Sequence, residues 1–241
     1  MVLSKKDDRP TLMLLPGLLC DETVWEPQIV AFGGDWRIEV TDFRGQDSFD
    51  GMADLVLAQA PARFSMAGHS MGGRVALEVM RRAPERVERL ALLSTGVHPV
   101  LPDEAEKRQA LIDLAWKEGM NVLARKWLPP MIHPSRREDN CLLERMVAMW
   151  CRSTPAIHEG QIRAALNRKD ARPVLATIRC PTLVVGGADD PWSPAEQQRD
   201  IANAIPGARL AIIPECGHMV TVERPAEVNQ VLGEWLATPG A

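Results

Sequence analysis

The chain has 241 residues, of which 46% are hydrophobic and 25% are charged, and its formal net charge is −4. These values are typical of a globular protein with one domain, or one domain with an insertion, and the absence of a basic excess argues against a nucleic-acid partner. The first apolar run, from Thr11 to Cys20, is interrupted by Pro16 and Gly17, which excludes a signal peptide and a membrane span. We therefore expect a cytoplasmic protein that binds neither membranes nor nucleic acid.

Short apolar runs alternate with helical patterns along much of the chain. This alternation predicts an α/β fold in which a mainly parallel sheet carries helices on both faces. The expected strands are 11–15, 37–41, 63–67, 89–95, 182–186 and 209–213, and the expected helices between and after them are 52–60, 71–83, 194–205 and 225–237.

The pentapeptide Gly68-His69-Ser70-Met71-Gly72 lies between an expected strand and an expected helix. At this position, a sharp strand-to-helix turn with this spacing presents a nucleophilic serine. The turn strains the serine backbone and requires residues without side chains two positions before and after it, which Gly68 and Gly72 provide. The motif therefore predicts Ser70 as a nucleophile, and the alternative is a glycine-rich connection with an inert serine.

No strand pattern appears in residues 97–178, where the sequence is helical and amphipathic. The expected helices are 103–118, 121–127, 136–151 and 156–168. An insertion at this point would lie over the carboxyl edge of the sheet, where ligands bind in open parallel sheets. We expect a core of residues 1–96 and 179–241 and a helical lid of residues 97–178. Trp127 and Trp150 are candidates to line a pocket under this lid, although aromatic residues at helical spacing more often pack a helix.

A nucleophilic serine needs a general base beside it and an acid that orients the base. His218 lies in a loop between the last expected strand and the last expected helix, and we expect it to be the base. The acid should follow the strand 182–186, where Asp189 and Asp190 are adjacent. The spacing of the flanking glycine and proline favours Asp190, and Asp189 is the alternative.

Attack on a carbonyl carbon produces an oxyanion, which preorganised N–H groups stabilise by roughly 3–4 kcal/mol each. The expected donors are the N–H of Met71, at the start of the helix after the nucleophile, and the N–H of Leu18, in the loop after the first strand. This chemistry needs no metal or organic cofactor. The five cysteines are scattered and lack metal-type spacing, which also predicts no metal site.

Ser70, Asp190 and His218 in this order, with an early Pro-Gly loop and a helical insertion, resemble the α/β-hydrolase fold superfamily over nearly the whole chain. Within the superfamily, the stretch from Leu14 to Trp25 and the pentapeptide look like small bacterial carboxylesterase-type members. The resemblance implies hydrolysis of a small-molecule ester, lactone or thioester through an acyl-serine intermediate. A receptor-like protein that binds a small apolar ligand is a further hypothesis.

Arg74 leads to another hypothesis. The run from Ser70 to Arg74 is similar to that of 2-succinyl-6-hydroxy-2,4-cyclohexadiene-1-carboxylate synthase, a lyase whose arginine at this place helps to hold an anionic substrate. The resemblance implies that Arg74 binds substrate, whereas the alternative is an exposed helix arginine paired with Glu78. Other basic residues available in the lid are Arg125, Arg145, Arg152 and Arg163.

Overall fold

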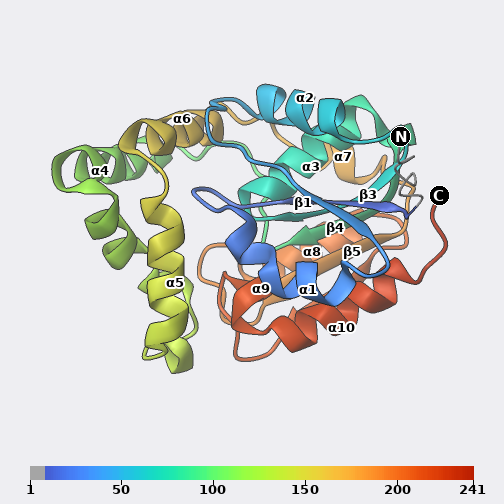
Figure 1. Ribbon diagram of the computed structural model, residues 1–241. Helices are drawn as coiled ribbons and strands as arrows, with labels where there is room; N and C mark the ends of the chain where they lie inside the picture. The colour runs from blue at the N-terminus through green and yellow to red at the C-terminus, as the bar shows by residue number, and fades with distance from the viewer. Residues whose placement is uncertain (1–8) are drawn as a thin grey trace, which may run out of the picture.

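A six-stranded sheet with the strand order β2-β1-β3-β4-β5-β6 organises residues 9–241, the part of the chain that the computed structural model describes (Figure 1). Every pair of neighbouring strands is parallel, which confirms the predicted parallel sheet. Each strand ends within two residues of its predicted limits. The strands are β1 (Thr11–Leu15), β2 (Arg37–Val40), β3 (Phe64–His69), β4 (Val87–Leu93), β5 (Thr182–Gly187) and β6 (Arg209–Ile213).

Helices cover both faces of the sheet, as the sequence predicts. Successive strand residues point to opposite faces, so Leu12 and Leu14 of β1 join one apolar cluster with Trp235, whereas Met13 joins a second cluster with Val75. Figure 1 shows α1, α9 and α10 on the first face and α2, α3 and α7 on the second. The elements outside residues 97–178 are η1 (Glu22–Trp25), α1 (Glu26–Phe32), α2 (Phe49–Gln59), α3 (Met71–Arg82), η2 (Pro84–Arg86), α8 (Ala195–Ala204), α9 (Val220–Glu223) and α10 (Pro225–Leu236).

Residues 97–178, called the helical segment below, contain no strand. Figure 1 shows α4, α5 and α6 projecting past one edge of the sheet, on the side away from the two chain ends. The elements of the segment are α4 (Glu104–Trp127), η3 (Pro129–Met131), η4 (Pro134–Arg136), α5 (Asn140–Cys151), α6 (Pro155–Leu166) and α7 (Arg172–Leu175).

Two boundaries within the segment show how local chemistry shapes it. Helix α4 bends at Gly119, whose φ of 86° is accessible mainly to glycine, so the predicted helices 103–118 and 121–127 are the two arms of one bent helix. The prediction that a helix begins at residue 136 was wrong. The Asp139 side chain caps the N–H of Leu142 at 3.0 Å, and α5 begins only at Asn140. The short helices α1, α7 and α9 were not predicted.

Candidate active site

Ser70 stands at the turn between β3 and α3 in a strained conformation, with φ 54° and ψ −113°. Such a conformation costs about 1–3 kcal/mol and persists only where the surroundings fix it. Here the Ser70 N–H donates to the Leu93 carbonyl at 2.8 Å, and the Thr95 hydroxyl donates to the Ser70 carbonyl at 2.7 Å. A Cβ atom on Gly68 would lie 2.4 Å from the Gly72 oxygen, and one on Gly72 would lie 2.0 Å from a backbone oxygen of β1. Packing therefore requires both glycines of the motif.

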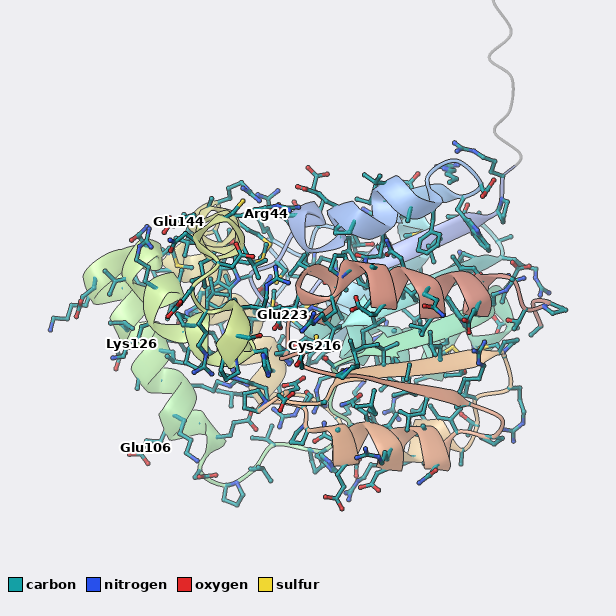
Figure 2. The ribbon with its side chains drawn as sticks, turned by 90° about the horizontal axis from the view of Figure 1, so that it is seen from below. Arg44, Glu106, Lys126, Glu144, Cys216 and Glu223 are labelled. Carbon is teal, nitrogen blue, oxygen red and sulfur yellow. The ribbon has the colours of Figure 1, made fainter. Side chains whose placement is uncertain are left out.

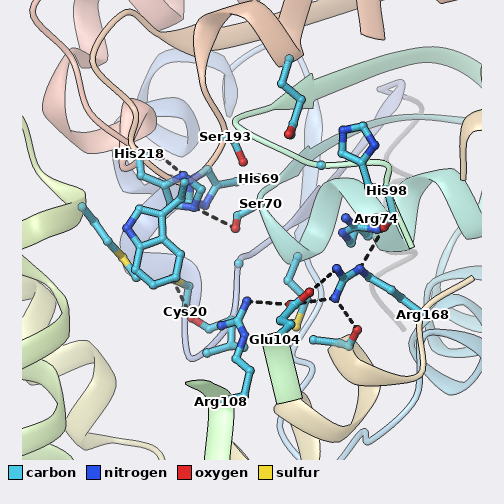
Figure 3. A pocket seen from close by; sticks show the side chains of 18 of the residues that line it. Cys20, His69, Ser70, Arg74, His98, Glu104, Arg108, Arg168, Ser193 and His218 are labelled. Atoms are coloured by element: carbon cyan, nitrogen blue, oxygen red, sulfur yellow. Dashed lines mark hydrogen bonds and ion pairs between the residues drawn. The ribbon is translucent and has the colours of Figure 1, made fainter. Parts of the chain in front are cut away.

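His218 joins Ser70 to Asp190 through two hydrogen bonds, of which Figure 3 shows the one to Ser70. Its Nε2 lies 2.9 Å from the Ser70 Oγ, and its Nδ1 lies 2.8 Å from the Asp190 Oδ2. The other carboxylate oxygen accepts the N–H groups of Trp192 and Ser193 at 2.8 and 2.9 Å. Burial alone would raise the pKa of Asp190, but the charge of His218 and these hydrogen bonds lower it. An ionised Asp190 accepts a hydrogen bond from the Nδ1–H of His218, which leaves Nε2 unprotonated and able to accept the serine proton.

Asp189, the alternative acid, does not contact His218. Its carboxylate is half exposed and lies 3.6 Å from the Nε2 of His133. Of the two adjacent aspartates, the structure therefore brings only Asp190 to His218.

The two expected oxyanion donors face the same cavity as Ser70. Met71 is the first residue of α3, so its N–H has no partner within the helix. Among residues 9–241, the Leu18 N–H donates to no protein acceptor. Two backbone donors without an acceptor in the described part of the chain therefore belong to residues that line the cavity of Ser70, and an oxyanion site requires such donors.

His69, the residue before Ser70, contacts the backbone of His218, the expected base. The imidazole is buried, and its Nε2 lies 2.9 Å from the carbonyl oxygen of His218. Because a carbonyl only accepts, this Nε2 carries the proton. Burial, followed by repulsion from His218, lowers the pKa of His69 to about 4, so the ring is neutral at pH 7. No role for His69 was predicted, although it lies inside the motif.

Glu223 holds the loop of His218 from the other side and was not identified in the sequence. Its carboxylate is fully buried and accepts three backbone N–H groups, from Gly217 at 3.1 Å, Met219 at 2.9 Å and His133 at 2.8 Å. The first two flank His218, and the third belongs to the helical segment. Figure 2 shows Glu223 at the junction between the core and that segment. One buried carboxylate thus ties the base loop to the helical segment.

A cavity of about 340 Å³ opens beside Ser70, between the core and the helical segment. Trp127 and Trp150, the predicted lining residues, both border it, with their ring centroids 5.3 Å apart. Trp192, which follows the acid loop, completes an aromatic wall, and its ring lies 5.1 Å from that of Trp127. The Arg108 guanidinium lies 5.7 and 5.9 Å from the Trp127 and Trp192 rings. The wall therefore joins side chains of both regions.

Three arginines, Arg74, Arg108 and Arg168, lie on one side of Ser70 in the cavity, with the single carboxylate of Glu104 among them (Figure 3). Glu104 pairs with Arg168 at 2.5 Å and with Arg108 at 3.4 Å. Within the described part of the chain, the Arg74 guanidinium makes no hydrogen bond or ion pair. Burial, followed by repulsion from Arg168, lowers the pKa of Arg74 to about 9, which leaves it cationic at neutral pH. The cavity therefore holds an uncompensated positive charge beside the serine.

The structure corrects the expectations for the other basic residues. Glu78 does not pair with Arg74, because it contacts Arg81, Arg82 and Lys169 instead. None of the four lid arginines named from the sequence lines the cavity. Each forms an ion pair away from it: Arg125 with Glu144, Arg145 with Glu26, Arg152 with Asp21 and Arg163 with Asp47.

Cys20 also lines the cavity, but its thiol is a poor nucleophile. Burial raises the pKa of Cys20 to about 12, which keeps the thiol protonated. Residues 9–241 contain no cluster of three or more His, Cys, Asp or Glu side chains arranged to hold a metal ion. Likewise, none of the helices described is both long and apolar enough to cross a membrane.

Comparisons with known proteins agree with this geometry. A family model described as the alpha/beta hydrolase family matches residues 12–231. The chain is 27% identical over 239 residues to pimeloyl-(acyl-carrier protein) methyl ester esterase of Nitrosomonas europaea, covering 90% of this chain and 92% of that protein. It is 31% identical over 244 residues to the RutD protein of Rhizobium rhizogenes, whose name refers to carbamate hydrolysis, covering 93% of this chain and 91% of that protein.

The same similarity extends to solved structures. A thermophilic esterase from Thermogutta terrifontis, determined with malate bound, superimposes with a TM-score of 0.85 at 26% identity. The match covers 95% of this chain and 90% of the esterase. The similarity to these hydrolases therefore includes both the core and the helical segment.

Proposed function

Because the chain belongs to the alpha/beta hydrolase family, we propose that it is a serine hydrolase that cleaves a carboxylic ester, lactone or thioester through an acyl-Ser70 intermediate. The observation that carries this proposal is the unbroken hydrogen-bonded relay from Ser70 through His218 to Asp190 at the wall of a cavity. The helical segment acts as the lid of that cavity, and the partner is a small-molecule substrate.

The geometry supports a two-step reaction. His218 Nε2 takes the hydroxyl proton as Ser70 Oγ attacks the carbonyl carbon, and Asp190 stabilises the imidazolium that forms. The oxyanion accepts hydrogen bonds from the N–H groups of Leu18 and Met71. His218 then returns its proton to the leaving alcohol or thiol, and water, activated by the same imidazole, releases the acyl group from the serine.

Replacement of the nucleophile tests the proposal. In a panel of short and long acyl esters, lactones and thioesters, Ser70→Ala should lower kcat by roughly 10⁶-fold on every substrate that the native protein cleaves. The melting temperature should change little, because Ser70 makes its structural contacts through its backbone. Near-native turnover by the folded variant would contradict the proposal.

The charge of the cavity supports a narrower substrate class, an ester whose acyl or alcohol part carries a carboxylate. A buried guanidinium without a partner is costly and gains most from an anion that enters its site. Arg74 meets this description, and it lies on the first turn of α3, next to the nucleophile. We propose that Arg74 binds the carboxylate of the substrate and that the aromatic wall of Trp127 and Trp150 contacts its apolar part.

The same observation favours a second candidate, a lyase in which the relay abstracts a proton from a carboxylate-rich substrate. Arg74→Ala separates the two candidates, with Arg125→Ala, at an exposed ion pair away from the cavity, as the matched control in the helical segment. The ester hydrolase predicts that hydrolysis of carboxylate-bearing esters falls about 10- to 100-fold, while neutral p-nitrophenyl esters react as before. A protein that shows no hydrolysis across the panel, but whose elimination from anionic substrates depends on Arg74, is the lyase.

A further inference from the structure

The loop that carries Leu18 is a tight turn in a strained conformation. The Cys20 N–H donates to the Gly17 carbonyl at 3.1 Å, which closes a four-residue turn. Leu19, its third residue, has a φ of 61°, in the left-handed region that such turns usually reserve for glycine. A leucine stays in this region only if its surroundings hold it there.

The helical segment supplies the group that holds it. The Gln161 Oε1 of α6 accepts the Leu19 N–H at 2.8 Å, across 142 residues of sequence. Both residues are almost fully buried, so no water replaces this bond. This acceptor fixes the orientation of the peptide group between Leu18 and Leu19. Leu19 could leave the left-handed region only if that peptide group rotated.

Helix α6 is capped at its start and contacts the core. Its first turn is capped by the Thr154 hydroxyl, which accepts the Ile157 N–H at 3.2 Å. Gly160 of the helix lies beside Asp47 of the core, and Arg163 pairs with the same aspartate at 3.1 Å. The side-chain oxygen of Gln161 is therefore held in place by a helix that contacts the core.

We infer that Gln161 is a positioning residue of the active site: by binding the Leu19 N–H, it keeps the Leu18 N–H directed at the position of the oxyanion. The inference rests on the proposed function. Gln161 does not touch the reacting atoms, and it acts only through the loop. The consequence is that the oxyanion site is complete only while the helical segment is seated on the core.

The test is Gln161→Met, which keeps the length of the side chain and removes the acceptor. Oxyanion donors act on the transition state, so kcat should fall roughly 10- to 100-fold while KM for the same chromogenic ester stays within about twofold. The rate at which a fluorophosphonate modifies Ser70 should fall in parallel. Gln161→Glu, which restores an acceptor oxygen, should keep kcat within about threefold of native. Gln109→Met, at an exposed glutamine of α4, should have no effect.

Two results would overturn the inference: a kcat of Gln161→Met within twofold of native, or a loss of kcat that Gln161→Glu shares. If the methionine variant does not fold, Gln161→Glu decides alone, because a tenfold loss in a folded protein that still carries an acceptor contradicts the positioning role and a native kcat supports it. Ser70→Ala, assayed beside these variants, separates failure of the proposed function from failure of this inference. Turnover by that variant overturns the proposed function itself, whereas an inactive Ser70→Ala with an unaffected Gln161→Met overturns only this inference.

Discussion

The core and the helical segment contribute to the site in different ways. The core provides Ser70, Asp190 and His218 from loops that follow β3, β5 and β6, and backbone contacts fix each of them. The helical segment provides side chains: Trp127 in the wall and Gln161 under the oxyanion loop. Changes to the core relay should therefore reduce turnover of every substrate, whereas the effects of changes to the segment should depend on the substrate or act through positioning.

The largest effect should come from the acid of the core. Asp190→Asn should lower kcat by about 10⁴-fold, because the amide stabilises neither the imidazolium nor the required tautomer of His218. Asp189→Asn is the matched control, and it should stay within twofold of native because its carboxylate faces His133. Steady-state kinetics of both variants measure these effects, and equal losses of kcat would contradict the assignment of Asp190 as the acid.

At the junction of the two regions, Glu223→Gln should reduce both stability and turnover. The amide nitrogen would face a backbone N–H that now donates to a carboxylate oxygen, which should cost about 2–3 kcal/mol in the free energy of unfolding. Displacement of the adjacent His218 should lower kcat about tenfold. Urea unfolding and kinetics measure the two effects. Glu215→Gln, at an exposed surface ion pair, should change the unfolding free energy by less than about 0.5 kcal/mol, and a similar loss there would remove the special role of Glu223.

Each region contains a buried histidine whose pKa is lowered, and acid should therefore destabilise both regions. Burial lowers the pKa of His158, in the segment, to about 4, as it does for His69 in the core. A depressed folded-state pKa means that the stability is present above the unfolded value of about 6.5 and is lost as the pH falls toward 4, by about 2 kcal/mol per histidine at pH 5.

Both ring nitrogens of His158 lack partners among the described residues, so His158→Phe should remove its share of this acid loss without other cost. Unfolding midpoints in urea at pH 7 and pH 5 check this, with His98→Phe, at an exposed position, as control. An unchanged pH dependence in His158→Phe would show that this histidine is not buried in its neutral form.

The smallest effect should come from the cavity wall. Trp127 is buried against Trp150 and Trp192, whereas Trp116, on the same helix, is 58% exposed. Trp127→Leu should raise KM about tenfold for a bulky ester and leave kcat within about threefold, since it removes binding area and not chemistry. Trp116→Leu should change neither value. Equal effects of the two variants would argue that Trp127 acts only through folding.

The nucleophile and the order of the relay could be predicted because their constraints are local. The glycines at positions 68 and 72 follow from close backbone contacts at the elbow, and such contacts leave a fixed spacing in the sequence. The parallel sheet could also be predicted, because the alternating apolar runs that form its strands are local features of the sequence. The choice between Asp189 and Asp190 rested on spacing alone, and only the fold shows which carboxylate meets His218.

The supporting residues could not be predicted because their partners are distant in sequence. Helical spacing paired Arg74 with Glu78, but Arg81 and Arg82 of the same helix, together with the distant Lys169, occupy that carboxylate and leave the guanidinium of Arg74 free to face the cavity. Gln161 and Glu223 bind backbone groups of loops far along the chain, and a single glutamine or glutamate carries no sequence pattern.

The central claim is that Ser70 is the nucleophile of this site, and covalent labelling tests it most directly. The active protein is treated with a fluorophosphonate until turnover stops, digested, and mapped by mass spectrometry. We expect one phosphonyl group per chain, on the peptide that contains Ser70, and no label in Ser70→Ala. A label on another residue that tracks the loss of activity, or full turnover after complete labelling of Ser70, would contradict it.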